Sequence, residues 1–390
     1  MYKRNLVFAG ACLGILLFGI GLITLGSVAG DLKEKFRLDE ITSGTLFSIM
    51  PIGILAGSLL FGPVCDRYGY KLLLILACAG MFAGFEGIAY ASSLTFLKLC
   101  IFLFGVSGGI LNGATNAAVA DISTDAKAAN LSLLGVFFGI GALGMPFILG
   151  ILKHRYSFEQ ILASAGALTI LIGIYYLFIQ FPASKKEQGF AITKSSGLFK
   201  SSVLILIAFF LFCQGSFEAI INNWTTTYLT AQLSVTESNA LYALSLYVAG
   251  MTAMRFFWGT VLRTVPPAKM IMASFVFILA GITLLKFGSS FNFDLTGLIL
   301  TGIGLGAGFP VMLGVTASLY AERSGTAFSL VLVVSLAGNM MVNYMMGIIA
   351  NRYGINHLTT VAFAELIVMF LLALFIFKKI NNSQEMIVGK

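Results

Sequence analysis

Long apolar runs follow one another along almost the whole chain, and short polar segments separate them. A run of about 20 apolar residues is long enough to cross a lipid bilayer as an α-helix. We identify twelve such runs, at residues 5–29, 44–63, 71–91, 94–119, 131–152, 161–181, 201–229, 239–262, 268–287, 294–319, 325–349 and 357–377. The pattern therefore predicts an all-α membrane protein with twelve transmembrane helices in a lipid bilayer.

The longest polar segment lies at the middle of the chain, and it divides the predicted spans six and six. This arrangement predicts two pseudo-symmetric bundles rather than one continuous array. The expected organisation is an N-terminal six-helix bundle at 1–181, a cytoplasmic linker at 182–200, a C-terminal six-helix bundle at 201–380 and a cytoplasmic tail at 381–390.

Composition narrows the range of functions. Hydrophobic residues make up 58% of the 390 residues and charged residues only 10%, whereas soluble domains have about 25% charged residues. The two histidines and five cysteines show no metal-binding or disulfide spacing, and the sequence offers no phosphate-binding loop or catalytic constellation. We therefore expect no enzyme activity, no cofactor and no metal site.

The positive charges indicate an orientation in the membrane. The net charge of +8 is spread over short loops instead of forming a patch, so we expect no nucleic-acid partner. With the N-terminus placed inside, the inner segments hold almost twice as many lysines and arginines as the outer segments. Because positive loops stay on the cytoplasmic side, the sequence predicts a multi-pass protein of a bacterial-type inner (plasma) membrane with both termini in the cytoplasm.

A charged motif with the spacing G-x-x-x-D-R-x-G-x-K follows the second predicted span. Its fixed residues are Gly62, Asp66, Arg67, Gly69 and Lys71. Glycine permits the close approach of two helices, and charges at helix ends form contacts in one conformation that another conformation breaks. We interpret the motif as a conformational gate.

A weaker copy of this motif follows the eighth span. Gly259 and Arg263 lie in it, and Arg255 precedes it by one helical turn. Asp121 ends the fourth span at the inner face, where it is expected to cap the helix or to contact Arg255 or Arg323. We assign Asp121, Arg255 and Arg263 to the same gate.

The two halves also match in glycine-rich segments, at 105–113 in span four and 302–310 in span ten. Dense glycine lets helices pack closely or bend. Together with the motif at 62–71 and the six-plus-six layout over the whole chain, these segments make the sequence resemble the major facilitator superfamily of transporters. The resemblance implies alternating access by a monomer, with the substrate bound between the halves and spans one, four, seven and ten lining the cavity.

A narrower resemblance concerns the seventh span. The segment from Gln214 to Tyr228 is similar to the corresponding span of the fucose–proton symporter group of sugar transporters. Proton symporters of that group place acidic residues in spans one and four, whereas span four here carries Asn112 and Asn116. The resemblance therefore favours a sugar substrate and leaves the coupling ion open between a proton and sodium.

Glu218 lies near the middle of the seventh span, and Gln214 and Asn222 share its helix face at spacings of four residues. An ionisable side chain in a membrane is costly and usually marks a substrate or proton pathway. A carboxylate between two amides can bind sugar hydroxyls and can take up a coupling proton. The alternative is a protonated structural glutamate that bonds to a neighbouring helix.

Other polar and aromatic residues extend this candidate site. Asn112 and Asn116 share one face of span four, where amides either line the cavity or bond to another helix. Glu86 and Glu365 lie in spans that the resemblance places at the periphery, and we expect structural or lipid-interface roles for them. The remaining substrate-binding candidates are Asn223, Trp224, Asn339 and Asn343.

The sequence thus predicts a secondary active transporter that moves a small polar solute, a sugar or sugar derivative, by proton-coupled symport. One alternative is a drug or amphiphile–proton antiporter, because an interior rich in Met and Phe adapts to varied ligands. Another is a non-transporting membrane receptor or scaffold, which the complete motif at 62–71 argues against.

Overall fold

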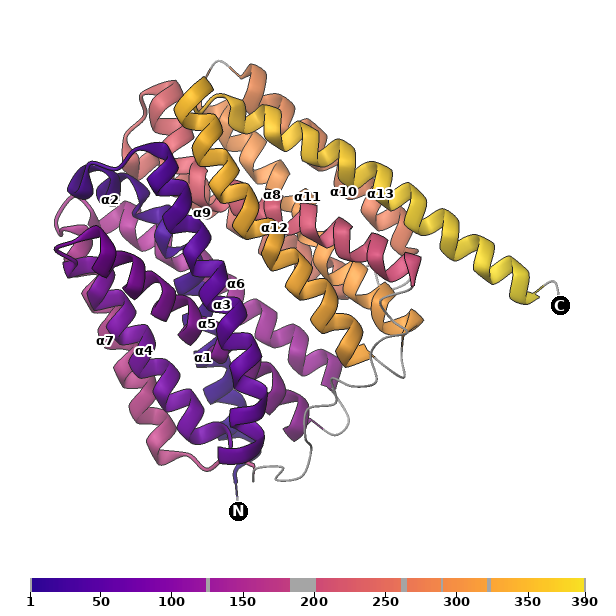
Figure 1. Ribbon diagram of the computed structural model, residues 1–390, viewed down its shortest axis with the longest axis horizontal. Helices are drawn as coiled ribbons and strands as arrows, with labels where there is room; N and C mark the ends of the chain where they lie inside the picture. Colours follow the sequence, from indigo (N-terminus) through magenta and orange to yellow (C-terminus); the bar gives the residue numbers. More distant parts are fainter. Residues whose placement is uncertain are drawn as a thin grey trace. The chain divides into compact units, whose positions relative to one another are not determined.

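The computed structural model of the protein describes residues 2–123, 127–182, 201–260, 265–288, 290–320 and 324–388. Within these residues every regular element is an α-helix (Figure 1). In chain order the helices are α1 (Arg4–Ser27), α2 (Ala29–Phe36), α3 (Glu40–Tyr68), α4 (Tyr70–Tyr90), α5 (Leu94–Ile122), α6 (Lys127–Leu152), α7 (Phe158–Phe178), α8 (Ser202–Leu233), α9 (Glu237–Thr260), α10 (Pro267–Phe287), α11 (Phe291–Leu319), α12 (Ser324–Tyr353) and α13 (His357–Val388).

In the described residues, twelve helices are long and apolar enough to cross a membrane, which confirms the twelve predicted spans. Helix α2 has no counterpart in the prediction. Its eight residues include Asp31, Lys33, Glu34 and Lys35, so it is too short and too polar for a span. The hydropathy pattern therefore does not identify α2 as a helix. One of its residues, Asp31, belongs to a polar cluster described below.

Local sequence explains where several helices begin and end. The side chain of Asp39 accepts a hydrogen bond from the backbone N–H of Thr42 at 2.8 Å and so caps α3. Ser157 and Gln160 form a capping box at the start of α7. Gly69 separates α3 from α4 with φ of +82°, a conformation that glycine adopts without strain.

The chain forms two compact units. The first consists of Met1–Phe190 and Asn223–Ser245, and the second of Ala191–Asn222 and Leu246–Lys390. The end of α8 and the beginning of α9 thus belong to the first unit, whereas the rest of both helices belongs to the second. The predicted linker at 182–200 lies outside the described residues from position 183 onward.

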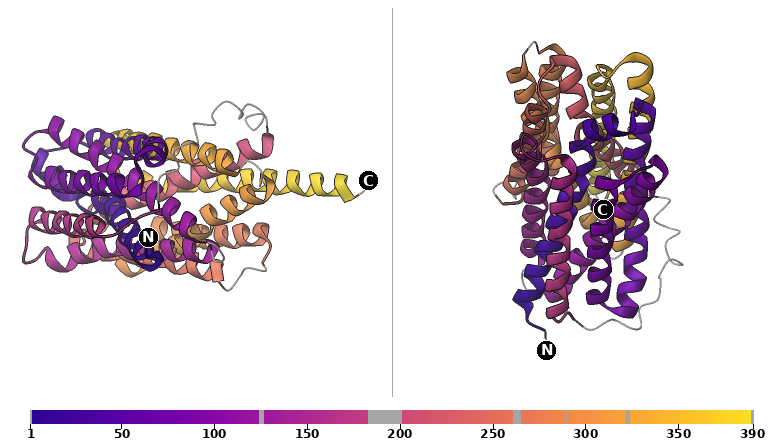
Figure 2. Two further views of the ribbon diagram at one scale, coloured as in Figure 1. Left: turned by 90° about the horizontal axis from the view of Figure 1, so that it is seen from below. Right: turned by 90° about the vertical axis from the view of Figure 1, so that its left-hand side faces the viewer.

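In the first unit, α1 packs against α5, α6 and α7, and α4 packs against α5 and α7. Glycine allows the close approach of α1 and α6, because a Cβ atom at Gly141 would clash with the backbone carbonyl of Leu16. In the second unit, α10 packs against α11 and α13. The yellow helix α13 extends well beyond its neighbours in that unit (Figure 2).

The internal repeat is visible as equivalent contacts in the two units. Gly105 of α5 faces the backbone carbonyl of Met50 in α3, and Gly302 of α11 faces that of Tyr247 in α9. Each residue of the second contact lies 197 residues after its counterpart. The glycine-rich segments therefore serve the close helix packing that their composition predicts.

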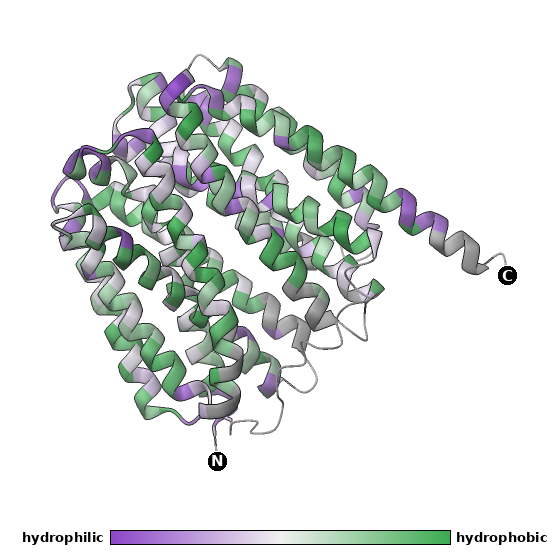
Figure 3. Cartoon of the chain, in the orientation of Figure 1, coloured by the Kyte–Doolittle hydropathy of each residue, from purple (hydrophilic) through white to green (hydrophobic). Residues whose placement is uncertain are grey.

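Apolar residues run along the length of the helices, and hydrophilic residues gather at helix ends and in loops (Figure 3). Large apolar side chains within the spans, such as Leu171 and Val276, are strongly exposed on the protein surface. Contact between so many apolar side chains and water is unfavourable, whereas contact with lipid is not. The surface therefore agrees with a location in the membrane.

Candidate functional site

Glu218 of α8 and Arg255 of α9 form an ion pair within the second unit. Nη2 of Arg255 lies 3.3 Å from each carboxylate oxygen of Glu218. Gln214, one turn earlier on α8, donates from Nε2 to Oε1 of Glu218 and to the backbone carbonyl of Leu305 on α11, each at 2.9 Å. We call Gln214, Glu218 and Arg255 the charged site, and three helices meet there.

Several buried polar atoms close to the charged site have no hydrogen-bond partner among the described residues. They are Nε of Arg255, the hydroxyl of Tyr247 and Oδ1 of Asn222. Tyr247 interacts electrostatically with both Glu218 and Arg255. An unsatisfied buried polar group costs about 1–3 kcal/mol, so these three atoms call for a partner that the described residues do not supply, such as water or a polar ligand.

The charged site faces away from the apolar outer surface. Phe209 is 53% exposed and lies nine residues before Glu218, which is about two and a half helical turns and therefore the opposite face of α8. The exposed Leu246 has the same spacing to Arg255 on α9. The side chains of Glu218 and Arg255 are 15% and 28% accessible, so a small ligand can reach the pair.

The ion pair is loose enough to be exchanged. Both contacts come from the same guanidinium nitrogen, and their length of 3.3 Å exceeds the about 2.7–2.9 Å of a tight charge-assisted hydrogen bond. The two opposite charges cancel, which removes much of the cost of placing either one in a membrane. A charged ligand can therefore compete for one partner of the pair.

The structure shows an ion-pair partner for Arg255. Sequence reasoning assigned Arg255 to the gate, with Asp121 as one expected contact, and in the structure Arg255 pairs with Glu218. Its role in the gate stays a prediction. Arg255 precedes the end of α9 at Thr260 by more than one turn, and it falls inside the candidate membrane span Glu237–Phe257. The signal was present in the sequence, because Arg255 falls within the predicted span 239–262.

The two asparagine pairs have the same arrangement in the two units. In α5, Nδ2 of Asn116 donates to the backbone carbonyl of Asn112 at 2.8 Å and to its Oδ1 at 3.1 Å. In α12, Asn343 donates to the same two atoms of Asn339 at 2.9 and 3.0 Å. Asn112 and Asn116 are half-buried, so they keep access for a ligand, whereas Asn343 is fully buried.

Asn223 and Trp224 lie in the part of α8 that belongs to the first unit, and both are buried. The Trp224 ring meets the Phe47 ring of α3 edge to face, with 5.3 Å between the centroids. Trp224 therefore packs against another side chain instead of facing an open space. The predicted site is divided, with Asn112, Asn116, Asn223 and Trp224 in the first unit and Gln214, Glu218, Asn222, Asn339 and Asn343 in the second.

Part of the predicted gate can be described. Nζ of Lys71 donates to the backbone carbonyl of Leu177 in α7 at 2.6 Å, and the Tyr70 hydroxyl donates to Asp121 at 2.7 Å. Asp121 thus joins the end of α5 to the start of α4, directly beside the motif. The surroundings of Gly62, the side chains of Asp66 and Arg67 and the whole of Arg263 lie outside the described residues.

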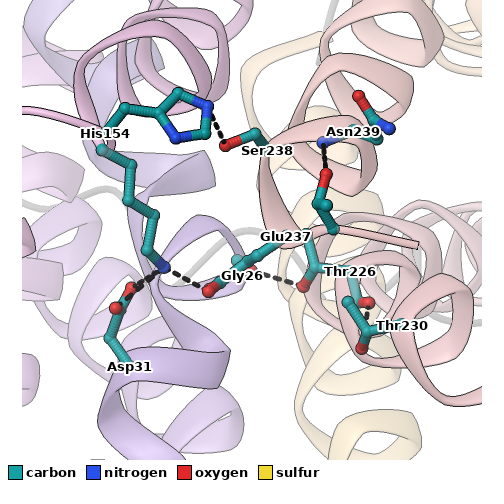
Figure 4. Close-up of polar contacts among 10 residues, drawn as sticks. Gly26, Asp31, His154, Thr226, Thr230, Glu237, Ser238 and Asn239 are labelled. Atoms are coloured by element: carbon teal, nitrogen blue, oxygen red, sulfur yellow. Dashed lines mark hydrogen bonds and ion pairs between the residues drawn. The ribbon is translucent and has the colours of Figure 1, made fainter. Parts of the chain in front are cut away.

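A second polar cluster, which the sequence did not predict, lies in the first unit (Figure 4). Nζ of Lys153, just after α6, lies 2.8 Å from Oδ1 of Asp31 in α2 and also contacts Glu237 at the start of α9. We call these three residues the outer cluster, because the predicted orientation places them away from the cytoplasm. These ion pairs connect the start of α9 to the bundle formed by the N-terminal helices.

Hydrogen bonds support the outer cluster on both sides. The Ser238 hydroxyl and Nε2 of His154 are 3.3 Å apart, and the Thr226 hydroxyl donates to the backbone carbonyl of Gly26 at 3.0 Å (Figure 4). Burial raises the pKa of Asp31 to about 6, although the hydrogen bond and the charge of Lys153 act in the opposite direction. No spacing in the sequence links Asp31, Lys153 and Glu237, because they are more than 80 residues apart.

The structure also describes Glu86 and Glu365, the two acids for which we expected structural or lipid-interface roles. A Cβ atom at Gly166 of α7 would be 3.0 Å from Oε1 of Glu86, so Glu86 lies between α4 and α7. Oε2 of Glu365 in α13 is buried and has no hydrogen-bond partner in the described part of the chain. Neither carboxylate belongs to the charged site.

Gly308 of α11 makes room for the charged site, and this permits a specific test. A Cβ atom at Gly308 would clash with the side-chain amide of Gln214, whereas one at Gly314 meets nothing within 4 Å. We expect the added methyl group of Gly308→Ala to displace Gln214 from Glu218 and Leu305. Loss of the hydrogen bond to the charged Glu218 should weaken solute binding about tenfold. The protein should remain folded. Binding titrations on Gly308→Ala and on the control Gly314→Ala check this, and equal affinities of the two variants would contradict it.

Comparison with known proteins places this geometry in a family context. A family model described as the Major Facilitator Superfamily matches residues 11–232 and 212–385. The uncharacterized MFS-type transporter YfkL of Bacillus subtilis (strain 168) is 22% identical over 391 residues, which cover 96% of this chain and 98% of the relative. The 3-(3-hydroxy-phenyl)propionate transporter of Escherichia coli (strain K12) is 25% identical over 90% of each chain.

Solved structures show the same fold. A point mutant of the nucleoside transporter NupG has a TM-score of 0.79 at 17% identity, over 96% of this chain and 99% of that chain. The D-xylose-proton symporter has a TM-score of 0.80 at 13% identity, over 96% of this chain and 97% of that chain. These structures are all-helical transporters, and at such low identities the similarity concerns the fold.

Proposed function

Because the chain belongs to the Major Facilitator Superfamily, we propose that it carries out proton-coupled symport of a small polar solute, a sugar or sugar derivative, by alternating access. Membership makes the protein a membrane transporter of small molecules rather than an enzyme. The proposal concerns three finer properties: the class of the solute, the coupling ion and the direction in which the solute moves. We further propose that it works as a monomer in a bacterial-type inner membrane with cytoplasmic termini.

The charged site is the single observation that carries the proposal. Proton coupling by itself needs only one acidic group, whereas the charged site adds a guanidinium and an amide that can form hydrogen bonds with a solute. Here these groups face away from the apolar surface and remain accessible, and buried hydrogen-bonding atoms beside them lack partners among the described residues. Such a set of donors and acceptors suits a solute with several polar groups.

Glu218 is the group that we propose for coupling. It is the acid of the charged site, and its loose contact with Arg255 at 3.3 Å can be given up when a proton binds. Protonation removes the negative charge of Glu218. Two conformations in which Glu218 and Arg255 are at different distances then change in relative stability. A proton is favoured over sodium because a bound metal cation requires several ligands, and the described residues contain no group of three or more His, Cys, Asp or Glu side chains that could hold one.

The chemistry of the side chains at the charged site supports a polar solute, and no single relative decides its class. Gln214 and Asn222 offer amide groups of the kind that bind sugar hydroxyls. A fold shared with a D-xylose-proton symporter and a nucleoside transporter agrees with a polar solute. Relatives that include a 3-(3-hydroxy-phenyl)propionate transporter widen the range to hydroxylated acids.

One observation favours export of an amphiphile as a second candidate function. A groove of about 770 Å³ lies between α1, α6 and α7, and its lining is mainly apolar. Ile20, Met145 and Ile148 belong to this lining, with Gln160 and Ser164 as polar members. An apolar groove with a polar side suits amphiphilic ligands.

A melting-temperature shift distinguishes the two functions. The detergent-purified protein is heated with a panel of sugars and of lipophilic cations at pH 5.5 and pH 7.5. A ligand at ten times its Kd stabilises the folded protein by about 1.4 kcal/mol, so millimolar solutes suffice for a weak site. Symport predicts a shift with one family of polar solutes that is larger at pH 5.5. Shifts with lipophilic cations alone would contradict symport and support export.

A further inference from the structure

Arg255 is a cation placed in a solute site, and its present partner is a carboxylate. We propose that the transported solute carries a carboxylate group and that Arg255 binds this group in place of Glu218. The inference rests on the proposed function and specifies the solute within it. It makes Arg255 the residue that determines specificity for a negatively charged polar solute, such as an acidic sugar derivative or another hydroxylated acid.

The guanidinium of Arg255 has donors that Glu218 leaves unused. A guanidinium has five N–H donors, and its preferred partner is a carboxylate held by two nitrogens at once. Glu218 contacts a single nitrogen, Nη2, at 3.3 Å, and Nε of Arg255 is buried without a partner among the described residues. A solute carboxylate that contacts both Nε and Nη2 therefore gains a hydrogen bond that Glu218 does not make.

Two further groups suit hydroxyls on the same solute. Tyr247 is fully buried on α9, eight residues before Arg255, and its hydroxyl lacks a partner in the described part of the chain. Oδ1 of Asn222, one turn after Glu218, is likewise buried and unpartnered there. The hydroxyl of Tyr247 can donate or accept, and Oδ1 accepts. The site therefore offers a cation and two hydrogen-bonding groups, which matches a carboxylate that also carries hydroxyls.

Displacement of Glu218 explains how solute and proton are coupled. Once the solute occupies the guanidinium, the Glu218 carboxylate has lost its counter-charge. The other groups that the described part of the chain places beside it are neutral: Gln214 and Asn222 on α8, Tyr247 on α9 and the Leu305 carbonyl on α11. Glu218 then binds one proton from the side of higher proton activity, and it releases this proton on the other side when the solute leaves and the ion pair forms again.

The charge balance makes the inference specific. In the empty site, the negative Glu218 and the positive Arg255 add up to zero. In the loaded site, a neutral Glu218, a positive Arg255 and a singly negative solute also add up to zero. Transport of one such anion with one proton is therefore electroneutral, whereas symport of a neutral sugar with one proton moves a charge and responds to the membrane potential.

The test uses the full chain in proteoliposomes with two matched pairs of probes, D-glucuronate with D-glucose and 4-hydroxybenzoate with 4-hydroxybenzyl alcohol. Uptake is driven either by a pH gradient with the potential clamped at zero or by a potassium diffusion potential at equal pH. We expect uptake of one acid under the pH gradient, none of its neutral partner, and no response to the potential alone. Arg255→Lys keeps the charge but loses the two-nitrogen contact, so we expect at least a tenfold rise in KM for the acid.

Arg352→Lys on the exposed last turn of α12 is the matched control, and it keeps the wild-type KM. Potential-dependent uptake of glucose or the alcohol would overturn the carboxylate inference and leave proton-coupled transport of a polar solute in place. Uptake of an acid with an unchanged KM in Arg255→Lys would also overturn it, as would the absence of uptake for both acids. Acid uptake that ignores the pH gradient would instead contradict the coupling that the proposed function requires.

Discussion

Glu218→Gln abolishes uphill accumulation of the solute under a pH gradient, while exchange of labelled for unlabelled solute across the same membrane continues. Glutamine has nearly the shape of a protonated glutamate and can keep the contact with Gln214, but it can neither bind nor release a proton. The conformational change of the loaded protein is therefore retained, and the link to the proton gradient is lost. Uptake and exchange in proteoliposomes are measured with the same radiolabelled solute, and unchanged accumulation would exclude Glu218 as the coupling group.

Two further variants separate loss of coupling from loss of folding. Glu218→Gln leaves Arg255 without its counter-charge, and breaking a fully buried ion pair costs about 3–5 kcal/mol. The cost is smaller here because both side chains are partly accessible. The double variant Glu218→Gln, Arg255→Gln contains no unpaired charge, so we expect its melting temperature to return toward that of the wild type. Glu86→Gln, between α4 and α7, is the matched control and keeps accumulation.

Replacing Lys153 with methionine destabilises the outer cluster, because Asp31 and Glu237 then face each other without the cation between them. The side chains of Lys153 and Asp31 are 19% and 14% accessible, so the loss lies between that of a surface pair and that of a buried pair, at about 1–2 kcal/mol. We expect a melting temperature several degrees lower at pH 7.5. Addition of Asp31→Asn to this variant removes the repulsion and restores most of the loss.

The loss in Lys153→Met depends on pH with a definite sign. The pKa of Asp31 is raised from 3.8 to about 6 by burial, so its favourable contribution is complete below about pH 4 and disappears as the pH rises through 6. Without Lys153, protonation of Asp31 also removes the repulsion with Glu237. The difference between wild type and variant should therefore shrink between pH 7.5 and pH 5. A difference that grows on acidification would contradict the arrangement of the outer cluster.

Much of the fold follows from the sequence because a membrane span depends on one local property. About 20 apolar residues in a row are sufficient to identify it, so runs such as 71–91 predict α4 (Tyr70–Tyr90) almost to the residue. The repeat was also visible, because Gly105 and Gly302 must be small wherever helices approach closely. Helix α2 was missed because its hydropathy resembles that of a loop.

The candidate site was predictable only in part, because its partners come from different helices. Gln214 and Glu218 are one turn apart on α8, so helical periodicity places them on one face. The contact with Arg255 depends on how α8 and α9 pack, and no spacing in the sequence encodes it. The sequence did not identify Lys153 and Glu237 either, because their contact also depends on how helices pack. Each lies at a helix end, where a charged residue is common.

Proton movement that accompanies the solute tests the central claim most directly. Proteoliposomes with a pH-sensitive dye inside are given a solute gradient directed inward, with no pH gradient imposed and the membrane potential clamped. Symport predicts that the lumen becomes acidic as the solute enters, and that Glu218→Gln shows solute exchange without this signal. Entry of the solute through the wild-type protein with no change of internal pH would contradict proton-coupled symport.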